Sequence, residues 1–490
     1  MKAYLMFKDK NFKVDNTGMY NFEVTLGDIE IETILRATGD KDLLMINVLR
    51  CALANPLYDL EEIKYRQAVL RDFIANSEIV RDMYEICCDT STKIKKYWFG
   101  SSSGSLSNTY VSALDHLSYF IEGLKALREI ADKERKKFKS EGFINLFNDI
   151  EEELSDKYLK KVDMLVSELN NRDDYLISAD LGRNLNGINY VLRHVEGERK
   201  YKSTIFNRIP TYKIKEDDSN GKKDLENKKN LALVHAANAL AIADNHLDSY
   251  FNMLMNELAF YVGNLNLIDL LTQCKMPYCI PNMEDSGSFN RSWDELYDVA
   301  LISKKRRGVI SNSNNAHDIH LHIISGANSG GKTTFLRSFG QAQLMAQAGM
   351  IVGAKEFLCP IRNGIYTHFK KEEDKKIKSG KLDEELKRIS EIIDHLDKNS
   401  LILFNESFSS TNEREGSEIN NQIVDALTMH SHEVLSVSHL YTFASEYFND
   451  NKVEFLVAER KEDGSRSYKI LKGMPEKTAY GEDLYKKVFE

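Results

Sequence analysis

Residues 326–333 read Gly326-Ala327-Asn328-Ser329-Gly330-Gly331-Lys332-Thr333 and fit the phosphate-loop pattern G-x-x-x-x-G-K-[ST]. The apolar residues 321–325 before this loop predict a buried strand, and residues 334–350 after it predict a helix. In this setting the glycines let backbone N–H groups converge on phosphate oxygens at the positive end of the helix. A glycine-rich turn that binds nothing is the alternative, but it does not explain why strand, loop and helix occur together. The sequence therefore predicts a phosphate-binding site within an α/β domain.

The loop also assigns chemical roles to two side chains. Lys332 would reach the β and γ phosphates of a nucleotide, and the Thr333 hydroxyl would hold Mg²⁺. The predicted nucleotide-binding residues are Gly326, Ala327, Asn328, Ser329, Gly330, Gly331, Lys332, Thr333 and Thr334.

Two further apolar runs end in residues suited to the same site. Residues 401–404 predict a buried strand that ends in Asn405 and Glu406. A hydrolysing NTPase positions its attacking water beside such a carboxylate, so Glu406 is the candidate general base. Residues 434–438 predict another buried strand, and His439 after it is suited to polarise the γ phosphate. A strand-end histidine is more often only structural, so the role of His439 depends on the two motifs before it.

The first half of the chain has the pattern of long helices. No proline occurs between Pro56 and Pro210, so this part of the chain lacks the strongest helix breaker. Apolar residues recur at spacings of three and four, as on one face of a helix, over residues 79–86, 114–130 and 154–169.

One interruption of the helical pattern predicts a small β excursion at about residues 175–230. Runs rich in β-branched and aromatic residues predict strands at 175–179, 188–195 and 201–215. A charged, glycine-containing loop is expected over residues 215–230, before a last long helix from residue 231 to about residue 261.

A second boundary lies where Pro277, Pro281 and Gly287 cluster with polar residues. After it, short β runs alternate with helices, which is the α/β pattern. The fold prediction is therefore a mainly α-helical domain over residues 1–285, followed by an α/β P-loop domain over residues 286–490.

These motifs resemble a known family. The phosphate loop with Thr334, residues 401–406 with Thr411, and Ser438 with His439 look like the ATPase domain of the MutS mismatch-repair family, which belongs to the ABC-type ATPases. This resemblance implies that the cofactors are ATP and Mg²⁺ and that the enzyme is an ATP hydrolase. It also implies that Asn405 acts on the metal through a water molecule.

The likeness extends beyond the ATPase motifs. Residues 55–59 and 66–67 are similar to the family's helical core, and residues 257–261 resemble the end of its long lever helix. Residues 468–470 and 479–481 are similar to its closing strand and following helix. The first 285 residues would then form the core, lever and arm of the family.

The sequence departs from the family pattern in three places, and these departures indicate which form of the family it resembles. The core-like segment begins within about the first forty residues, so the resemblance is to a short form without the N-terminal mismatch-reading domains. The Phe22-Glu23 pair does not make the Phe-x-Glu wedge of those domains. Asn405 stands where the family usually has aspartate, which removes a negative charge near Mg²⁺.

The family also closes its nucleotide site with a signature loop from a second subunit. The local match is Ser379-Gly380-Lys381-Leu382, at the start of a charged helix that runs to residue 396. Ser379 and Gly380 are therefore expected to contact the nucleotide of a partner in a homodimer, although charged helix starts are common for other reasons.

The resemblance implies a DNA-binding clamp in mismatch repair or recombination, gated by ATP and acting on mismatched or branched duplexes. An ATP-gated clamp on ribosomes or structured RNA remains an alternative, as does a weakly hydrolysing scaffold. Four basic runs could contact phosphates, although each alone is usually a solvated face: residues 93–96, 133–139, 222–229 and 304–307. The run at 222–229 is the best candidate, and the run at 304–307 lies near the nucleotide site and can equally be a surface turn.

Composition excludes several other classes. With 42% apolar and 29% charged residues the chain has the composition of a globular protein, and a net charge of -9 argues against coating nucleic acid by bulk charge. Neither a signal peptide nor an apolar run long enough to span a bilayer is found. Six scattered cysteines are expected to pack in the core and not to bind metal, which favours a cytoplasmic protein.

Overall fold

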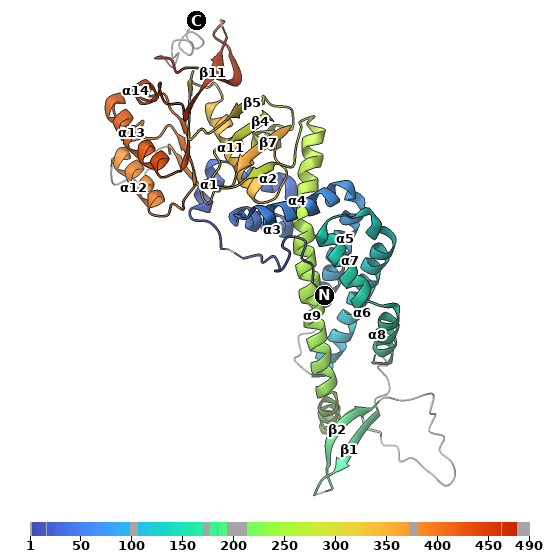
Figure 1. Cartoon of the computed structure of the whole chain (residues 1–490). Coiled ribbons are helices and arrows are strands. Elements are labelled where there is room, and N and C mark those ends of the chain that lie inside the picture. Colours follow the sequence, from blue (N-terminus) through green and yellow to red (C-terminus); the bar gives the residue numbers. More distant parts are fainter. Residues whose placement is uncertain are drawn as a thin grey trace, which may run out of the picture. The chain divides into compact units, whose positions relative to one another are not determined.

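The computed structural model describes residues 2–15, 17–98, 106–169, 176–183, 185–193, 213–371, 380–461 and 463–477. These residues form two compact units, each made from separate parts of the chain (Figure 1). Unit 1 contains Met1–Tyr4, Glu78–Lys139 and Phe143–Leu258, and unit 2 contains Leu5–Ser77, Ser140–Gly142 and Ala259–Glu490. Each unit is thus built from segments that alternate along the chain with those of the other unit. The expected division into two domains at residue 285 would instead give two continuous segments, and it stays a prediction.

Unit 1 is built mainly from helices, and the three helical patterns expected from the sequence are confirmed. The apolar face over residues 114–130 is buried, as Leu117, Phe120 and Leu127 show, whereas Leu165 in the pattern at 154–169 is 47% exposed. The helices are α5 (Ser77–Trp98), α6 (Leu106–Glu134), α7 (Glu141–Glu153), α8 (Asp156–Leu169) and the first part of α9 (Ser219–Gln273), with a short 3₁₀ turn at Arg135–Lys137.

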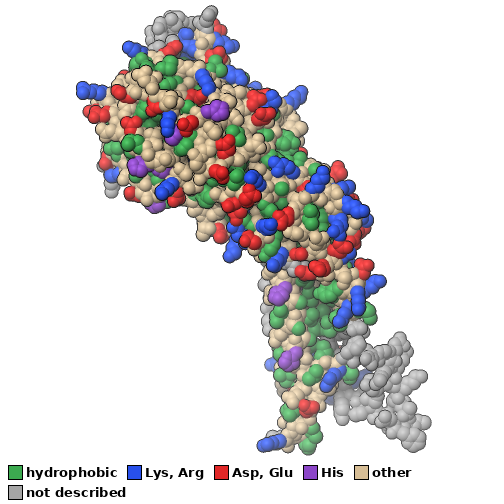
Figure 2. All heavy atoms as spheres, in the orientation of Figure 1, with side chains coloured by type: hydrophobic (Ala, Val, Ile, Leu, Met, Phe, Trp, Pro, Cys, Tyr) green, Lys and Arg blue, Asp and Glu red, His purple; other side chains and the backbone are tan. Residues whose placement is uncertain are grey.

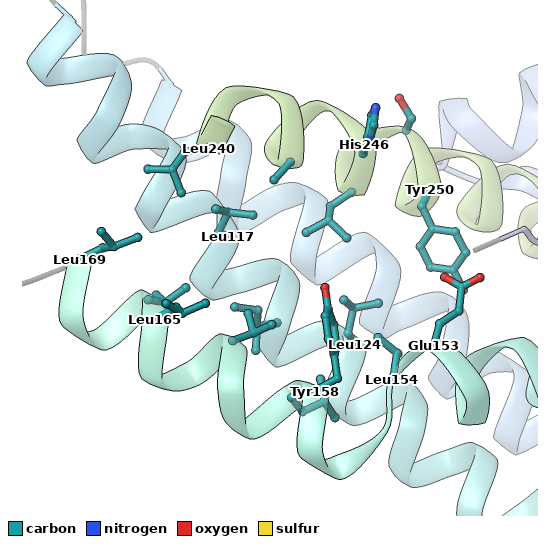
Figure 3. A pocket seen from close by; sticks show the side chains of 17 residues that line it. Leu117, Leu124, Glu153, Leu154, Tyr158, Leu165, Leu169, Leu240, His246 and Tyr250 are labelled. Atoms are coloured by element: carbon teal, nitrogen blue, oxygen red, sulfur yellow. The ribbon is translucent and has the colours of Figure 1, made fainter. Parts of the chain in front are cut away.

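Three of these helices leave a gap in their packing. A cavity of about 830 Å³ lies between α6, α8 and α9, and most of its lining is aliphatic (Figure 3). Leu117 and Leu124 of α6 face Leu165 of α8 across it. The Tyr250 hydroxyl at one end is buried and has no hydrogen-bond partner within the described part of the chain.

The β excursion is a hairpin of two antiparallel strands, β1 (Leu176–Leu181) and β2 (Gly187–Arg193). It confirms the first two expected strands. In the third expected strand, residues 201–212 lie outside the described residues and residues 213–215 are not in a strand.

The charged loop expected over residues 215–230 is wrong, because α9 already begins at Ser219. Asp218 Oδ1 accepts the Gly221 N–H at 2.8 Å, which caps the first turn of the helix. Lysine and glutamate are good helix formers, and one glycine within the first turn does not prevent the helix from starting.

Unit 2 begins with four helices, the last of which carries a buried arginine: α1 (Phe22–Asp28), α2 (Ile31–Gly39), α3 (Leu43–Ala54) and α4 (Leu60–Ala75). Arg66 of α4 donates hydrogen bonds to the carbonyls of Met6 and Ala348. The Tyr261 hydroxyl of α9 donates to Leu5 O at 2.6 Å. The N-terminal segment is thereby fixed to α4 and to the end of α9.

A six-stranded sheet forms the centre of unit 2. Its order is β12-β11-β6-β10-β9-β8, and all strands are parallel except β12, which pairs antiparallel with β11. The strands are β6 (Leu321–Gly326), β8 (Ile365–Phe369), β9 (Leu401–Asn405), β10 (Glu433–Val437), β11 (Val453–Arg460) and β12 (Arg466–Lys472). The three strands expected at residues 321–325, 401–404 and 434–438 are confirmed.

The connections of this sheet place a crevice at the end of β6. The chain proceeds from β8 to β9 to β10 and then passes over β6 to β11. The chain leaves β6 toward β8 at one edge of the sheet, whereas it leaves the neighbouring β11 toward β12 at the other edge. Ligands of open α/β sheets bind outside the carboxyl ends of strands where neighbouring connections diverge in this way. The helices that follow the strands are α11 (Lys332–Gln347), α12 (Lys381–Ile393), α13 (Glu413–Met429) and α14 (Tyr441–Ser445).

A second sheet has the order β3-β7-β4-β5. It contains β3 (Asn282–Glu284), β4 (Arg291–Leu296), β5 (Asn312–Ala316) and β7 (Glu356–Pro360), and α10 (Val299–Lys305) follows β4.

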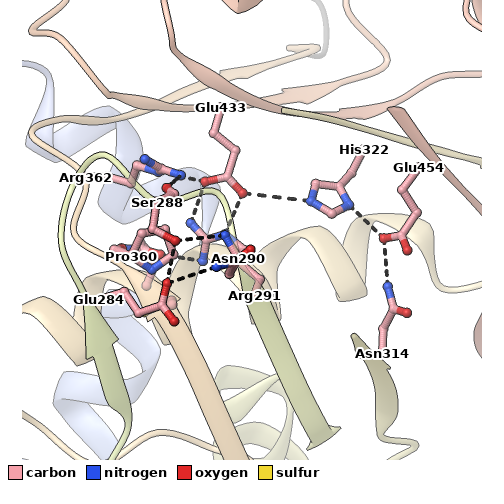
Figure 4. Close-up of polar contacts among 12 residues, drawn as sticks. Glu284, Ser288, Asn290, Arg291, Asn314, His322, Pro360, Arg362, Glu433 and Glu454 are labelled. Carbon is pink, nitrogen blue, oxygen red and sulfur yellow. Dashed lines mark hydrogen bonds and ion pairs between the residues drawn. The ribbon is translucent and has the colours of Figure 1, made fainter. Parts of the chain in front are cut away.

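A buried ionic cluster joins the two sheets (Figure 4). Glu433 of β10 bonds to Arg291 of β4 at 2.5 Å and 2.7 Å and to Arg362 at 2.7 Å. His322 of β6 extends the cluster to Glu454 at 3.0 Å. No helix in the described ranges is long and apolar enough to cross a membrane.

Candidate active site

The phosphate loop connects β6 to α11 and needs its glycines. Gly326 and Gly331 have φ values of 106° and 94°, a region that side chains disfavour. At Gly330, a Cβ atom would lie 2.8 Å from both the Ala327 carbonyl oxygen and the Ala458 Cβ. The backbone can therefore pass this close to β11 only without a side chain.

Lys332 lies in the first turn of α11 and is buried. Its Nζ donates hydrogen bonds to Gly326 O at 2.8 Å and to Ala327 O at 3.2 Å. Burial lowers the pKa of this amine, the charge of Glu406 raises it, and the charge of Arg466 lowers it. The amine thus rests on carbonyls of its own loop, at the place where a phosphate would attract it.

The two residues expected to organise Mg²⁺ are in contact. The Thr333 hydroxyl donates a hydrogen bond to Asn405 Oδ1 at 3.1 Å. Thr333 is in the first turn of α11 and Asn405 is the last residue of β9. Because Mg²⁺ prefers oxygen ligands and keeps several waters, a hydroxyl beside an amide oxygen suits it.

Glu406 follows β9 directly, in an unusual backbone conformation. Its φ is 54°, and its N–H donates to Val437 O at 2.8 Å, which fixes it to β10. Its carbonyl accepts the Ser409 hydroxyl at 2.7 Å. The charge of Glu406 acts on Lys332 and raises the pKa of its amine.

His439 lies two residues after β10 and is exposed. Strand β10 lies between β6 and β9, and Ser438 N donates to Ile324 O at 3.0 Å. The chain at His439 therefore leaves the sheet between the phosphate loop and the turn that carries Glu406.

The expected signature loop is described only in part. Ser379 lies outside the described residues. Gly380 precedes α12 as its N-cap, with open space around the position of a Cβ atom. The charged helix expected after it is confirmed, although it ends at Ile393.

Two neighbours of the phosphate loop were missed in the sequence. Arg466 of β12 donates from Nε to Asn328 O at 3.3 Å. Tyr468 has a φ of 61°, and a Cβ on Gly331 would lie 3.6 Å from its Cβ and carbonyl oxygen. No local signal marks either residue as part of the site, because the pairing of β12 with β11 brings them there.

A cavity of about 620 Å³ adjoins the loop. Gly331, Thr334 and Tyr468 line the side toward the phosphate loop. The other lining residues are Tyr297, Asp298, Leu301, Lys305, Arg307, Gly308, Val309, Ile310, Asn312, Phe335 and Ser338. Two members of the basic run at 304–307 therefore line this cavity.

Each of the four basic runs lies among acidic side chains. Where ion pairs are described, they join Lys93 to Glu122, Lys133 to Glu129, Lys228 to Asp224 and Lys304 to Glu30. On the face shown in Figure 2, basic and acidic side chains are interspersed over the described surface. The six cysteines are free thiols, and the described residues contain no cluster of three His, Cys, Asp or Glu side chains suited to a metal.

Comparison with known families accounts for both halves of the chain. Residues 58–274 match the family described as MutS2 N-terminal domain, and residues 322–487 match MutS domain V. Together these ranges cover more than three quarters of the sequence.

Individual relatives match over shorter segments. "Endonuclease MutS2" of Streptococcus equi subsp. equi is 28% identical over 166 residues, which are 33% of this chain and 21% of the relative. "Endonuclease MutS2" of Staphylococcus carnosus is 31% identical over 166 residues, with the same coverage. "MutS protein homolog 4" of Mus musculus is 26% identical over 216 residues, or 42% of this chain and 22% of the relative.

The matched segments thus span about a fifth of these relatives. The phosphate loop, the residues at the ends of β9 and β10, and the two matched families agree, and the chain belongs to the MutS family.

Proposed function

We propose that this chain is a Mg²⁺-dependent ATPase whose bound ATP gates a clamp on DNA. The observation that carries the proposal is the meeting of Lys332, Thr333, Asn405 and Glu406 around one loop at the carboxyl edge of the sheet. A cation, two oxygen donors for a metal and a carboxylate are the groups that phosphoryl transfer to water requires. Membership of the MutS family supports the same reading.

In this proposal the cavity beside the loop accepts the adenine base. It adjoins Gly331 and Thr334, where the nucleotide must leave the phosphate loop. Tyr468 offers an aromatic face at its wall, and its left-handed backbone is the kind of strain that concentrates at functional sites.

The chain's own residues then have separate tasks. Lys332 exchanges the carbonyls of Gly326 and Ala327 for phosphate oxygens, and the loop N–H groups bind the same phosphates. Thr333 would hold Mg²⁺, with Asn405 acting through water; the metal supplies positive charge beside the phosphates. Glu406 accepts a proton from the attacking water, and His439 supports the γ phosphate.

The clamp function is a proposal drawn from the family. Two copies would enclose two ATP molecules, and Gly380 at the start of α12 would reach the nucleotide of the other copy. Closing of this dimer on ATP would move the helical arms around duplex DNA, with mismatched or branched DNA as the preferred target. Slow hydrolysis would then release the DNA.

Nucleic-acid binding by the Glu406→Gln variant loaded with ATP and Mg²⁺ tests the proposal. The panel contains homoduplex, a single mismatch, a four-way junction and structured RNA at near-physiological salt, and Lys332→Ala is the control that should bind no nucleotide. We expect retention on mismatched or branched DNA that disappears without ATP. Binding to RNA alone would replace DNA by a ribosomal or RNA target, and hydrolysis by Glu406→Gln at the wild-type rate would refute the catalytic assignment.

A further inference from the structure

Glu406 belongs to a turn that is held in a strained form. Glu406 and Phe408 both have left-handed backbones, with φ values of 54° and 56°. For residues other than glycine this region costs roughly 1–2 kcal/mol each, so the surrounding structure must enforce it. The residue between them, Ser407, is buried. Its contacts therefore decide whether the turn keeps its shape.

The contacts of Ser407 converge on a histidine that no motif singles out. His368 of β8 is 1% exposed, and its Nδ1 lies 2.7 Å from Ser407 Oγ. The same hydroxyl lies 2.8 Å from the backbone oxygen of His368. The imidazole ring also stacks on Phe408, with ring centroids 5.4 Å apart and an interplanar angle of 22°. One side chain thus touches both residues that follow Glu406.

The second ring nitrogen of His368, Nε2, contacts helix α12. Nε2 lies 3.1 Å from the backbone oxygen of Glu385 in α12. Burial, with the charges of Arg388 and Lys371, lowers the pKa of His368 to about 4, so the ring is neutral at neutral pH. A neutral ring has one N–H, and because a carbonyl only accepts, Nε2 donates to Glu385 and Nδ1 is an acceptor. The single proton of the Ser407 hydroxyl is then shared between Nδ1 and the backbone oxygen of His368.

A second bond joins the same two elements. The Ser410 hydroxyl donates to Glu385 Oε1 at 2.8 Å, so the turn contacts Glu385 directly through Ser410 and indirectly through Ser407 and His368. Helix α12 begins directly after Gly380. A shift of the start of α12 would therefore be transmitted to the turn through the contacts of Glu385.

We propose that His368 is a positioning residue, which fixes through Ser407 the left-handed turn that presents Glu406 and ties this turn through Glu385 to α12. The inference rests on the proposed ATPase function and deepens it. If Gly380 contacts the nucleotide bound to a second copy, His368 links the presence of that nucleotide to the orientation of the Glu406 carboxylate in this chain.

Three substitutions of His368 separate its contacts. His368→Phe keeps a ring against Phe408 but removes both hydrogen bonds. His368→Asn places an amide near the position of Nδ1 and keeps the contact with Ser407, whereas His368→Gln reaches toward Glu385 instead. His322→Phe is the matched control, because His322 is equally buried in the same sheet but contacts Glu454.

The first measurement is hydrogen exchange of the full chain, which needs no turnover. In His368→Phe we expect amides of residues 405–411 to exchange about fivefold faster, as the loss of a hydrogen bond allows. His322→Phe should leave these amides unchanged. Unchanged exchange at residues 405–411 in His368→Phe would overturn the proposal, whether or not the protein hydrolyses ATP.

The second measurement is ATP turnover with nucleotide affinity from a fluorescent ATP analogue. We expect His368→Phe to lose roughly tenfold to a hundredfold in kcat, as a misplaced catalytic group does, with affinity changed less than about twofold. His368→Asn should recover most of kcat and His368→Gln should not. If His368→Phe and His322→Phe both lost kcat and nucleotide affinity to the same extent, His368 would have only a general structural role. Failure of the ATPase proposal would give a different result, because Glu406→Gln and the wild type would then show the same ATP turnover.

Discussion

Replacing Glu433 by glutamine should destabilise unit 2 strongly, although the side chain keeps its size. Glu433 is fully buried, and its one carboxylate pairs with both Arg291 and Arg362, which are 1% and 0% exposed. Burial alone would raise the pKa of Glu433, but the charges and hydrogen bonds of the two arginines lower it from 4.5 to about 2. That difference corresponds to about 3 kcal/mol of stabilisation of the carboxylate. Removal of one partner from a buried ion pair typically costs about 3–5 kcal/mol, which agrees.

The assay is urea unfolding followed by fluorescence. Trp293 of β4 is buried in this region, and Trp98 is the other tryptophan of the chain, so a Trp98→Phe background isolates the signal of Trp293. A loss of about 3 kcal/mol lowers the midpoint by about 1 M urea if m is about 3 kcal/mol per M. Glu62→Gln is the control, because its exposed pair with Lys10 should contribute less than about 1 kcal/mol.

The same reasoning fixes the pH dependence. The folded-state pKa of Glu433 is depressed, so its stabilisation is fully present above pH 4.5 and is lost as pH falls toward 2. The difference between wild type and Glu433→Gln should therefore shrink over that range. Equal urea midpoints for Glu433→Gln and wild type at pH 7 would refute the reasoning.

Three further predictions concern the nucleotide site. Asn405→Asp should lower the Mg²⁺ concentration that half-maximal turnover requires, because it restores a charge near the metal; an unchanged Mg²⁺ titration would contradict this. Gly330→Ala should abolish ATP binding, since its methyl group would lie 2.8 Å from Ala327 O, and calorimetric affinity within twofold of wild type would show that the loop adapts. Tyr468→Ala should weaken ATP binding about tenfold, as the loss of aromatic stacking does, while leaving inorganic triphosphate binding unchanged.

The parts of the site that lie close together in the sequence were predictable. The phosphate loop and the strand before it are local patterns, and so is the end of β9 with Asn405 and Glu406. Their meeting followed from the rule that parallel strands end at one edge of a sheet. The contact between Thr333 and Asn405 agrees with that expectation.

What could not be predicted depends on pairing between distant segments. Arg466 reaches Asn328 because β12 returns beside β11, and the lone His368 meets Ser407 because β8 pairs with β9. Neither contact leaves a mark in the local sequence. The misplaced start of α9 has a different cause, since Gly221 suggested a loop while the capping bond of Asp218 favours a helix.

The assembly of unit 2 from separated segments has a consequence for synthesis on the ribosome. Arg66 bonds to Ala348 across 282 residues, and Tyr261 reaches back 256 residues to Leu5. At about 5–20 residues per second, translation of the 282 residues takes about 14–56 s. During this interval the nascent N-terminal helices lack the surface on which they finally pack. Chaperone binding to residues 5–77 should therefore end only after Ala348 has emerged.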